Sequence, residues 1–85
     1  MAYTIDFTPV AEHQFKNLSR EIQTRLSPHI DALANNPRPP GVKKLKGGDN
    51  YWRIRVGDYR LLYEIHDNVL LVLAVRIAHR REAYR

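Results

Sequence analysis

The spacing of apolar residues changes along the chain, and each change indicates a new element. From Ala2 to Phe7 bulky apolar side chains stand at every second position, which is typical of a half-buried strand. From Pro9 to Leu18, and again from Ser19 to Leu33, apolar residues recur every three or four positions, which predicts a hairpin of two helices. Pro28 cannot donate a helical hydrogen bond, so we expect the second helix to kink or split at Ser27.

Three strands are predicted in quick succession near the end of the chain: Tyr51 to Val56, Tyr59 to His66, and Val69 to Ile77. Gly57-Asp58 and Asp67-Asn68 separate them and suit two-residue antiparallel turns. The last strand is apolar at nearly every position, so we expect it to lie centrally, beside the N-terminal strand. The sequence therefore predicts a single α+β domain over residues 1–85, with one four-stranded sheet and the helix hairpin packed on one face.

A two-residue turn at Gly57-Asp58 fixes which side chains share a face of the sheet. The pairing places Arg55 opposite Arg60, with Arg53 on the same face. Like charges directly opposite each other destabilise a sheet, which suggests a use for the clash. Guanidinium groups bind phosphate through paired hydrogen bonds, so the pattern predicts a phosphate cradle. The alternative is a solvated outer face.

The same reasoning, carried through Asp67-Asn68, places Leu71, Leu73 and Val75 on the arginine face. An apolar strip then lies beside a basic cluster. We expect a segment of a partner protein to cover it.

Composition narrows the possible functions. The chain has 14 basic and nine acidic residues, and the excess lies in residues 37–85, with eleven basic against five acidic, as expected of a surface that binds a polyanion. The absence of cysteine excludes disulfides and thiolate chemistry. The histidines show no metal-ligand spacing, so neither a metal nor a cofactor is expected. The longest apolar run is too short to span a bilayer, and a cytoplasmic protein is expected.

Four segments in a fixed order carry a family resemblance: Lys43 to Gly47, Tyr51 to Arg55, Asp58 to Tyr63, and the ending His79 to Arg85. Together with the strand and helix hairpin before them, they resemble the RelE/ParE superfamily of bacterial type II toxins, and its RelE branch in particular. The resemblance covers nearly the whole chain.

This resemblance implies a ribosome-dependent endoribonuclease that cuts messenger RNA in the decoding site. In that family the 2′-hydroxyl of the messenger attacks the adjacent phosphate and leaves a cyclic phosphate. The implied partners are the ribosome with its messenger and a cognate antitoxin with an acidic and apolar segment. This antitoxin segment would cover both the apolar strip and the arginines Arg55 and Arg60. The toxin–antitoxin complex is expected to be hetero-oligomeric and to bind DNA through the antitoxin.

The resemblance also implies roles for individual residues. Arg60 and Arg80 would hold the scissile phosphate, Arg53 and Arg55 would position the RNA backbone, and Tyr84 would stack or assist proton transfer. Further cations expected to contact RNA or the ribosome are Lys43, Lys44, Lys46, Arg81 and Arg85.

The proton acceptor is open in the sequence. Relatives carry lysine where Arg53 and Arg55 stand, and arginine is a poor base because its pKa exceeds about 12. His79 is a candidate by its unperturbed pKa, although a histidine at a strand end also serves as a surface or capping residue.

Two other functions are compatible with the same fold. One is a ParE-like toxin that binds DNA gyrase without nuclease chemistry, and the other is an inactive relative kept as a co-repressor. The gyrase-binding function leaves the arginines at positions 53, 55, 60 and 80, and Tyr84, largely without a role.

Overall fold

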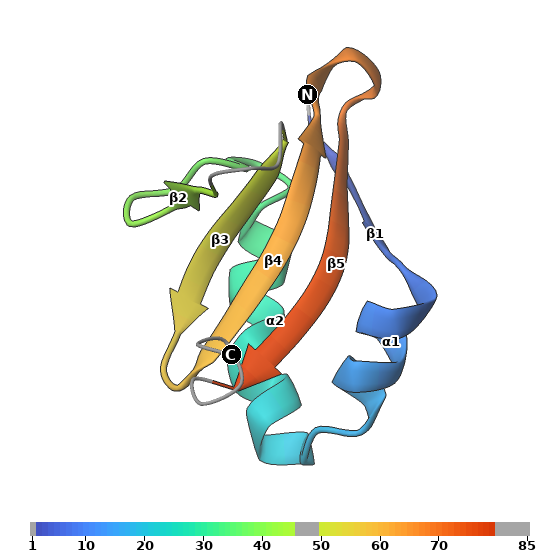
Figure 1. Cartoon of the computed structure of the whole chain (residues 1–85), viewed down its shortest axis with the longest axis vertical. Helices are drawn as coiled ribbons and strands as arrows, with labels where there is room; N and C mark the ends of the chain where they lie inside the picture. The colour runs from blue at the N-terminus through green and yellow to red at the C-terminus, as the bar shows by residue number, and fades with distance from the viewer. Residues whose placement is uncertain (1, 46–49, 80–85) are drawn as a thin grey trace.

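The computed structural model describes residues 2–45 and 50–79, which form two helices and one mixed five-stranded sheet (Figure 1). The predicted α+β class is confirmed, and the last strand lies beside the first, as expected. The elements in chain order are β1 (Thr4–Phe7), α1 (Pro9–Lys16), α2 (Arg20–Ala32), β2 (Lys43–Lys44), β3 (Tyr51–Val56), β4 (Tyr59–His66), the 3-10 turn η1 (Asp67–Val69) and β5 (Leu71–His79).

The sheet has five strands rather than the predicted four, in the order β1-β5-β4-β3-β2. The additional strand, β2, is only two residues long, and it pairs antiparallel with Trp52 and Arg53 of β3. Two polar lysines show no alternation, so sequence periodicity could not reveal this strand. β1 pairs parallel with β5, while the other neighbours are antiparallel.

Side-chain caps start both helices where the sequence predicts. The Thr8 hydroxyl accepts a hydrogen bond from the Ala11 amide at 3.2 Å, and Ser19 caps α2 in the same way. Of the two outcomes expected at Ser27, a kink or a split, the split does not occur, because α2 continues through Pro28 to Ala32. Two residues to either side of Pro28, Leu26 and Ile30 are buried in the core, and this packing outweighs the single lost hydrogen bond.

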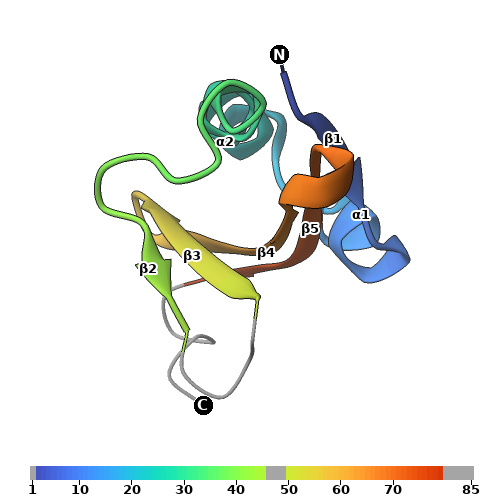
Figure 2. The same ribbon diagram turned by 90° about the horizontal axis from the view of Figure 1, so that it is seen from above.

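The core lies between α2 and one face of the sheet, as Figure 2 shows. α1 lies beside β1 and β5, where the Gln14 side chain accepts a hydrogen bond from the Ile77 amide at 2.8 Å. Neither helix in the described ranges has the length and apolarity needed to cross a membrane. The buried core residues are Ala11, Leu26, Ile30, Leu33, Ile54, Val56, Leu61, Tyr63, Ile65, Val72, Ala74 and Ile77.

The connection between β4 and β5 is longer than the predicted two-residue turn. It runs through η1 to Leu70, which has a φ of 51°, and His66 pairs with Leu71. Glu64 consequently pairs with Leu73 instead of Leu71. Because this register differs by two residues, Leu71 and Leu73 keep the face that was predicted for them.

A β-bulge interrupts the pairing of β4 with β5. Tyr63 pairs with Ala74, but the preceding Leu62 pairs with Arg76, so Val75 is the extra residue. The Val75 carbonyl accepts a hydrogen bond from the Thr8 hydroxyl at 3.1 Å. The bulge reverses the alternation of β5 from Arg76 onward, with consequences for the candidate site.

Candidate functional site

The β3–β4 hairpin has the predicted register. Arg55 pairs with Arg60, and Arg53 pairs with Leu62, so the three arginines share the face opposite the core. Gly57 in the turn has a φ of 60°, a left-handed conformation that favours glycine. A turn chemistry visible in the sequence thus positions the three guanidinium-bearing strand residues.

The arginine hollow is a cavity of about 210 Å³ on this face, lined by Gly41, Lys43, Arg53, Arg55 and Arg60. Arg55 is exposed, Arg53 is half-buried, and Arg60 is only 5% exposed. Within residues 2–45 and 50–79, no carboxylate oxygen forms an ion pair with Arg53 or Arg55. These guanidinium groups are therefore available to an external anion.

Arg76 is a cationic residue on the arginine face that the sequence did not single out. Its partner across β4 is Leu62, which pairs with Arg53 on the other side, so Arg53 and Arg76 flank Leu62. Strict alternation along β5 would have turned Arg76 toward the helices. The bulge at Val75 places it outward, where it is exposed.

The lysines before β3 are divided between the two faces of the strand pair. Lys43 pairs with Arg53 and lines the arginine hollow. Lys44 pairs with Trp52 and its ammonium lies 5.7 Å from the centroid of that ring, away from the arginines. Lys44 therefore does not line the arginine hollow, its predicted contact with RNA or the ribosome stays a prediction, and Lys46 lies outside the described residues.

His79 does not join the arginine hollow. It pairs with Tyr59 on the helix-facing side of the sheet, and the two rings meet edge-on with centroids 5.2 Å apart. It lines a different cavity, of about 300 Å³, beside α1. The bulge that turns Arg76 outward turns His79 inward, so this geometry does not support the prediction of His79 as proton acceptor. The other predicted residues of the ending, Arg80, Arg81, Tyr84 and Arg85, lie outside the described residues.

The predicted apolar strip lies on the arginine face in large part. Leu71 and Leu73 are half-buried there, whereas Val75 is half-buried at the bulge. Glu64 also lies on this face, and its carboxylate contacts His66 Nε2 at 2.8 Å. The strip and the hollow thus occupy one continuous side of the sheet.

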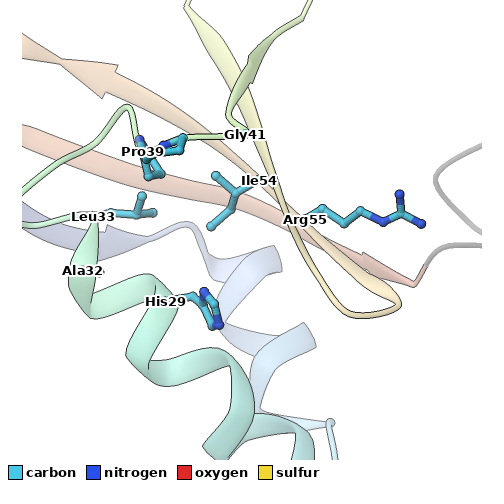
Figure 3. A pocket seen from close by; sticks show the side chains of 8 residues that line it. His29, Ala32, Leu33, Pro39, Gly41, Ile54 and Arg55 are labelled. Atoms are coloured by element: carbon cyan, nitrogen blue, oxygen red, sulfur yellow. The ribbon is translucent and has the colours of Figure 1, made fainter.

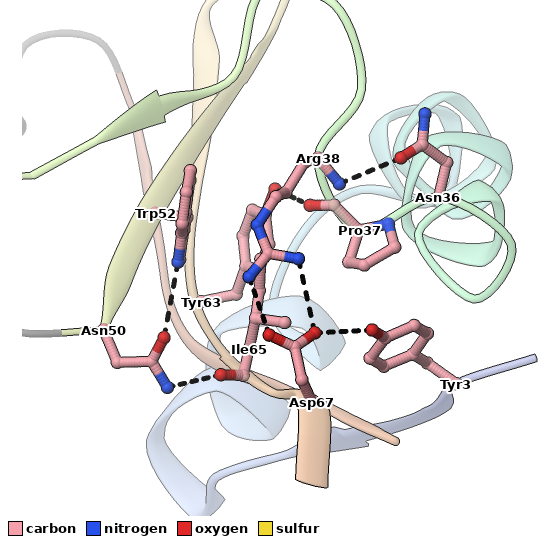
Figure 4. Close-up of polar contacts among 9 residues, drawn as sticks. All are labelled: Tyr3, Asn36, Pro37, Arg38, Asn50, Trp52, Tyr63, Ile65 and Asp67. Carbon is pink, nitrogen blue, oxygen red and sulfur yellow. Dashed lines mark hydrogen bonds and ion pairs between the residues drawn. The ribbon is translucent and has the colours of Figure 1, made fainter.

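A buried hydrogen bond anchors the segment before β3, whose residues Gly41 and Lys43 line the hollow (Figure 4). Tyr63 is completely buried, and its hydroxyl donates to the carbonyl of buried Pro37 at 2.7 Å. Burial raises the pKa of Tyr63 to about 12, so the hydroxyl keeps its proton at neutral pH.

An ion pair at the surface supports the same segment. The Arg38 guanidinium donates to both carboxylate oxygens of Asp67, at 3.3 and 2.9 Å, and lies 4.9 Å from the centroid of the Trp52 ring. The Tyr3 hydroxyl donates to Asp67 at 2.5 Å. Hydrogen bonds from Arg38 and then Tyr3 lower the pKa of Asp67.

A second cavity, of about 420 Å³, lies across β3 from the hollow (Figure 3). Its lining is mainly apolar, with Leu33 and Ile54 directed toward it and the Arg55 guanidinium directed away. It is lined by His29, Ala32, Leu33, Pro39, Pro40, Gly41, Ile54 and Arg55. Gly41 and Arg55 therefore border both cavities.

Known proteins share both the sequence pattern and the fold. Residues 5–84 match the family described as the ParE toxin of the type II toxin–antitoxin system parDE. The chain is 33% identical over 73 residues to toxin RelE3 of Methanocaldococcus jannaschii, covering 81% of each protein.

Two solved structures extend the comparison to the whole fold. One is the RelBE2 toxin–antitoxin complex of Mycobacterium tuberculosis, with a TM-score of 0.81 and 29% identity, covering 94% of this chain and 100% of the other. The other is the archaeal RelE–RelB complex of Pyrococcus horikoshii, with a TM-score of 0.82 and 24% identity, covering 94% and 97%. Sequence and fold agree, and the chain belongs to the RelE/ParE superfamily of type II toxins, as a RelE-like member.

Proposed function

We propose that this toxin is a ribosome-dependent endoribonuclease that cleaves messenger RNA in the decoding site. The observation that carries the proposal is the arginine hollow, where Arg53, Arg55 and Arg60 line one small cavity together with Lys43. Arg55 pairs with Arg60, so two guanidinium-bearing residues lie directly opposite each other on this face. Guanidinium groups bind phosphate through paired hydrogen bonds, which gives the arrangement a function.

The chemistry suits a site built from guanidinium groups. The RNA provides its own nucleophile, the 2′-hydroxyl, so the protein has to hold the phosphate for in-line attack and stabilise the developing negative charge. Arg53, Arg55 and Arg60 supply fixed positive charge for both tasks. The family resemblance adds Arg80 at the scissile phosphate and Tyr84 at the base or the proton.

A cognate antitoxin is the second part of the proposal. Relatives with the same fold are described in complexes with RelB antitoxins. An acidic and apolar antitoxin segment would match the side of the sheet that combines the hollow with Leu71 and Leu73. Binding there neutralises the arginines and blocks the RNA, and the complex would bind DNA through the antitoxin.

Mapping of messenger 5′ ends after induction in cells tests the nuclease. The wild type should produce cuts phased with the ribosome, and the variants Arg55→Ala, Arg80→Ala and Tyr84→Phe should lose them. Arg20→Ala is a matched control, because Arg20 is exposed at the start of α2 and does not line the hollow. Intact ribosome-bound messengers in arrested wild-type cells would refute the proposal.

The match to the family described as ParE toxin favours one other candidate, a toxin that acts on DNA gyrase without cleaving RNA. The same induction experiment separates the two. Broken chromosomes with intact messengers would identify the gyrase-binding function, and the arginine variants would then remain toxic.

A further inference from the structure

Arg76 lies beside the arginine hollow without being part of its lining. On the arginine face, Arg55, Arg60 and Ala78 form one row across strands β3, β4 and β5, and Arg53, Leu62 and Arg76 form the next row. Successive rows on one face are two residues apart, or about 7 Å along the strands. This separation is comparable to that between neighbouring phosphates of a nucleotide strand.

Nothing in the described structure assigns Arg76 a stabilising role. Its side chain is exposed, and no carboxylate in the described ranges forms an ion pair with it. Arg53 stands in the same row and adds like charge nearby. Repulsion between these two cations lowers the stability of the folded state.

The bulge at Val75 gives this residue its direction. If Val75 paired with Leu62 and β5 had no bulge, Arg76 would pair with Leu61 and point into the core beneath α2, where an unpaired charge is costly. Bulges commonly redirect a side chain next to a functional site. Here the redirected side chain extends the cationic surface from the hollow across Leu62 to β5.

We propose that Arg76 binds a second phosphate of the RNA, next to the one held in the arginine hollow. This inference rests on the proposed function, since it names a further contact to the same substrate. Arg76 acts as a positioning residue: it fixes the path of the strand across the sheet and does not touch the reacting atoms. A guanidinium that anchors the neighbouring phosphate restricts the orientation of the scissile one.

The salt dependence of RNA binding tests the contact directly. The probe is a fluorescein-labelled single-stranded RNA oligonucleotide with 2′-O-methyl groups, which cannot be cleaved by 2′-hydroxyl attack, and anisotropy is followed over a salt series. Loss of one phosphate contact lowers the slope of log K against log salt by about 0.7 for a single strand. Arg76→Gln should show this decrease, whereas Arg20→Gln, with the same change of charge, should retain the wild-type slope.

Arg76→Thr repeats the test with a side chain that favours strands, and carries it alone if Arg76→Gln fails to fold. Equal slopes for the folded Arg76 variant and Arg20→Gln would overturn the inference. A variant with an unchanged RNA slope but weakened antitoxin binding would also overturn it and assign Arg76 to the partner interface. If the lower slope is found while the wild type leaves messengers intact in cells, the nuclease proposal fails and the Arg76 contact stands.

Discussion

Removal of one buried hydroxyl should loosen the segment that leads into the arginine hollow. In Tyr63→Phe the carbonyl of Pro37 loses its donor at 2.7 Å, and both residues are buried, so water cannot easily replace it. A buried acceptor left without a partner costs about 1 to 3 kcal/mol, partly offset because the hydroxyl no longer has to be desolvated. We expect a net loss of about 1 to 2 kcal/mol.

Urea unfolding followed by circular dichroism measures this loss, and the melting temperature should fall by about 5 to 15 °C in a domain of this size. Tyr51→Phe is the matched control, since Tyr51 is 39% exposed, and it should change stability by less than about 0.5 kcal/mol. The reasoning is refuted if the two variants unfold at the same urea concentration.

The stability of the fold at alkaline pH tests the role of the Tyr63 hydroxyl independently. The pKa of Tyr63 is raised from 10.0 to about 12 in the folded chain. The folded state therefore favours the neutral phenol. The resulting stabilisation of the fold is fully present below pH 10 and is lost as the pH rises toward 12. Tyr63→Phe should lack this part of the alkaline destabilisation, and an unchanged alkaline profile would contradict the assignment.

Three further predictions concern other parts of the molecule. Arg38 lowers the pKa of Asp67, so the ionised Asp67 stabilises the fold above the ordinary carboxyl pKa, and this stabilisation is lost as the pH falls through the pKa of Asp67 in the folded chain. Asp67→Asn should therefore make the loss of stability at acid pH, measured by circular dichroism, less steep. Gly57→Ala should cost about 1 to 2 kcal/mol in urea unfolding, because φ is 60° there, and an unchanged midpoint would exclude strain in the turn. Leu73→Glu should weaken antitoxin binding about tenfold or more in calorimetry, whereas Val10→Glu, 60% exposed on α1, should not.

Local sequence signals determined much of the fold and part of the site. The glycine turn at Gly57 fixed the register of β3 with β4, and this register alone brings Arg53, Arg55 and Arg60 to one face. The periodic apolar residues located both helices. Such features are readable because each depends on residues only a few positions apart in the chain.

Other features depend on contacts between distant segments. Pro28 stays inside α2 because the helix packs on the sheet, and β2 exists because β3 offers an edge. The loop between β4 and β5 is longer than predicted. Asp67 and Asn68 also suit a two-residue turn, and only the pairing of β5 with β4 selects the longer loop.

The sequence by itself determined the family, the α+β class and three arginines on one face, since motif order, periodicity and a short turn act locally. Only the tertiary structure decided which residues of β5 join them. One extra residue at Val75, with its carbonyl bonded to Thr8, turns Arg76 toward the arginines and His79 away from them. Strand alternation has a period of two, so a single bulge reverses every side chain that follows, and the partner strand, not the local sequence, sets its position.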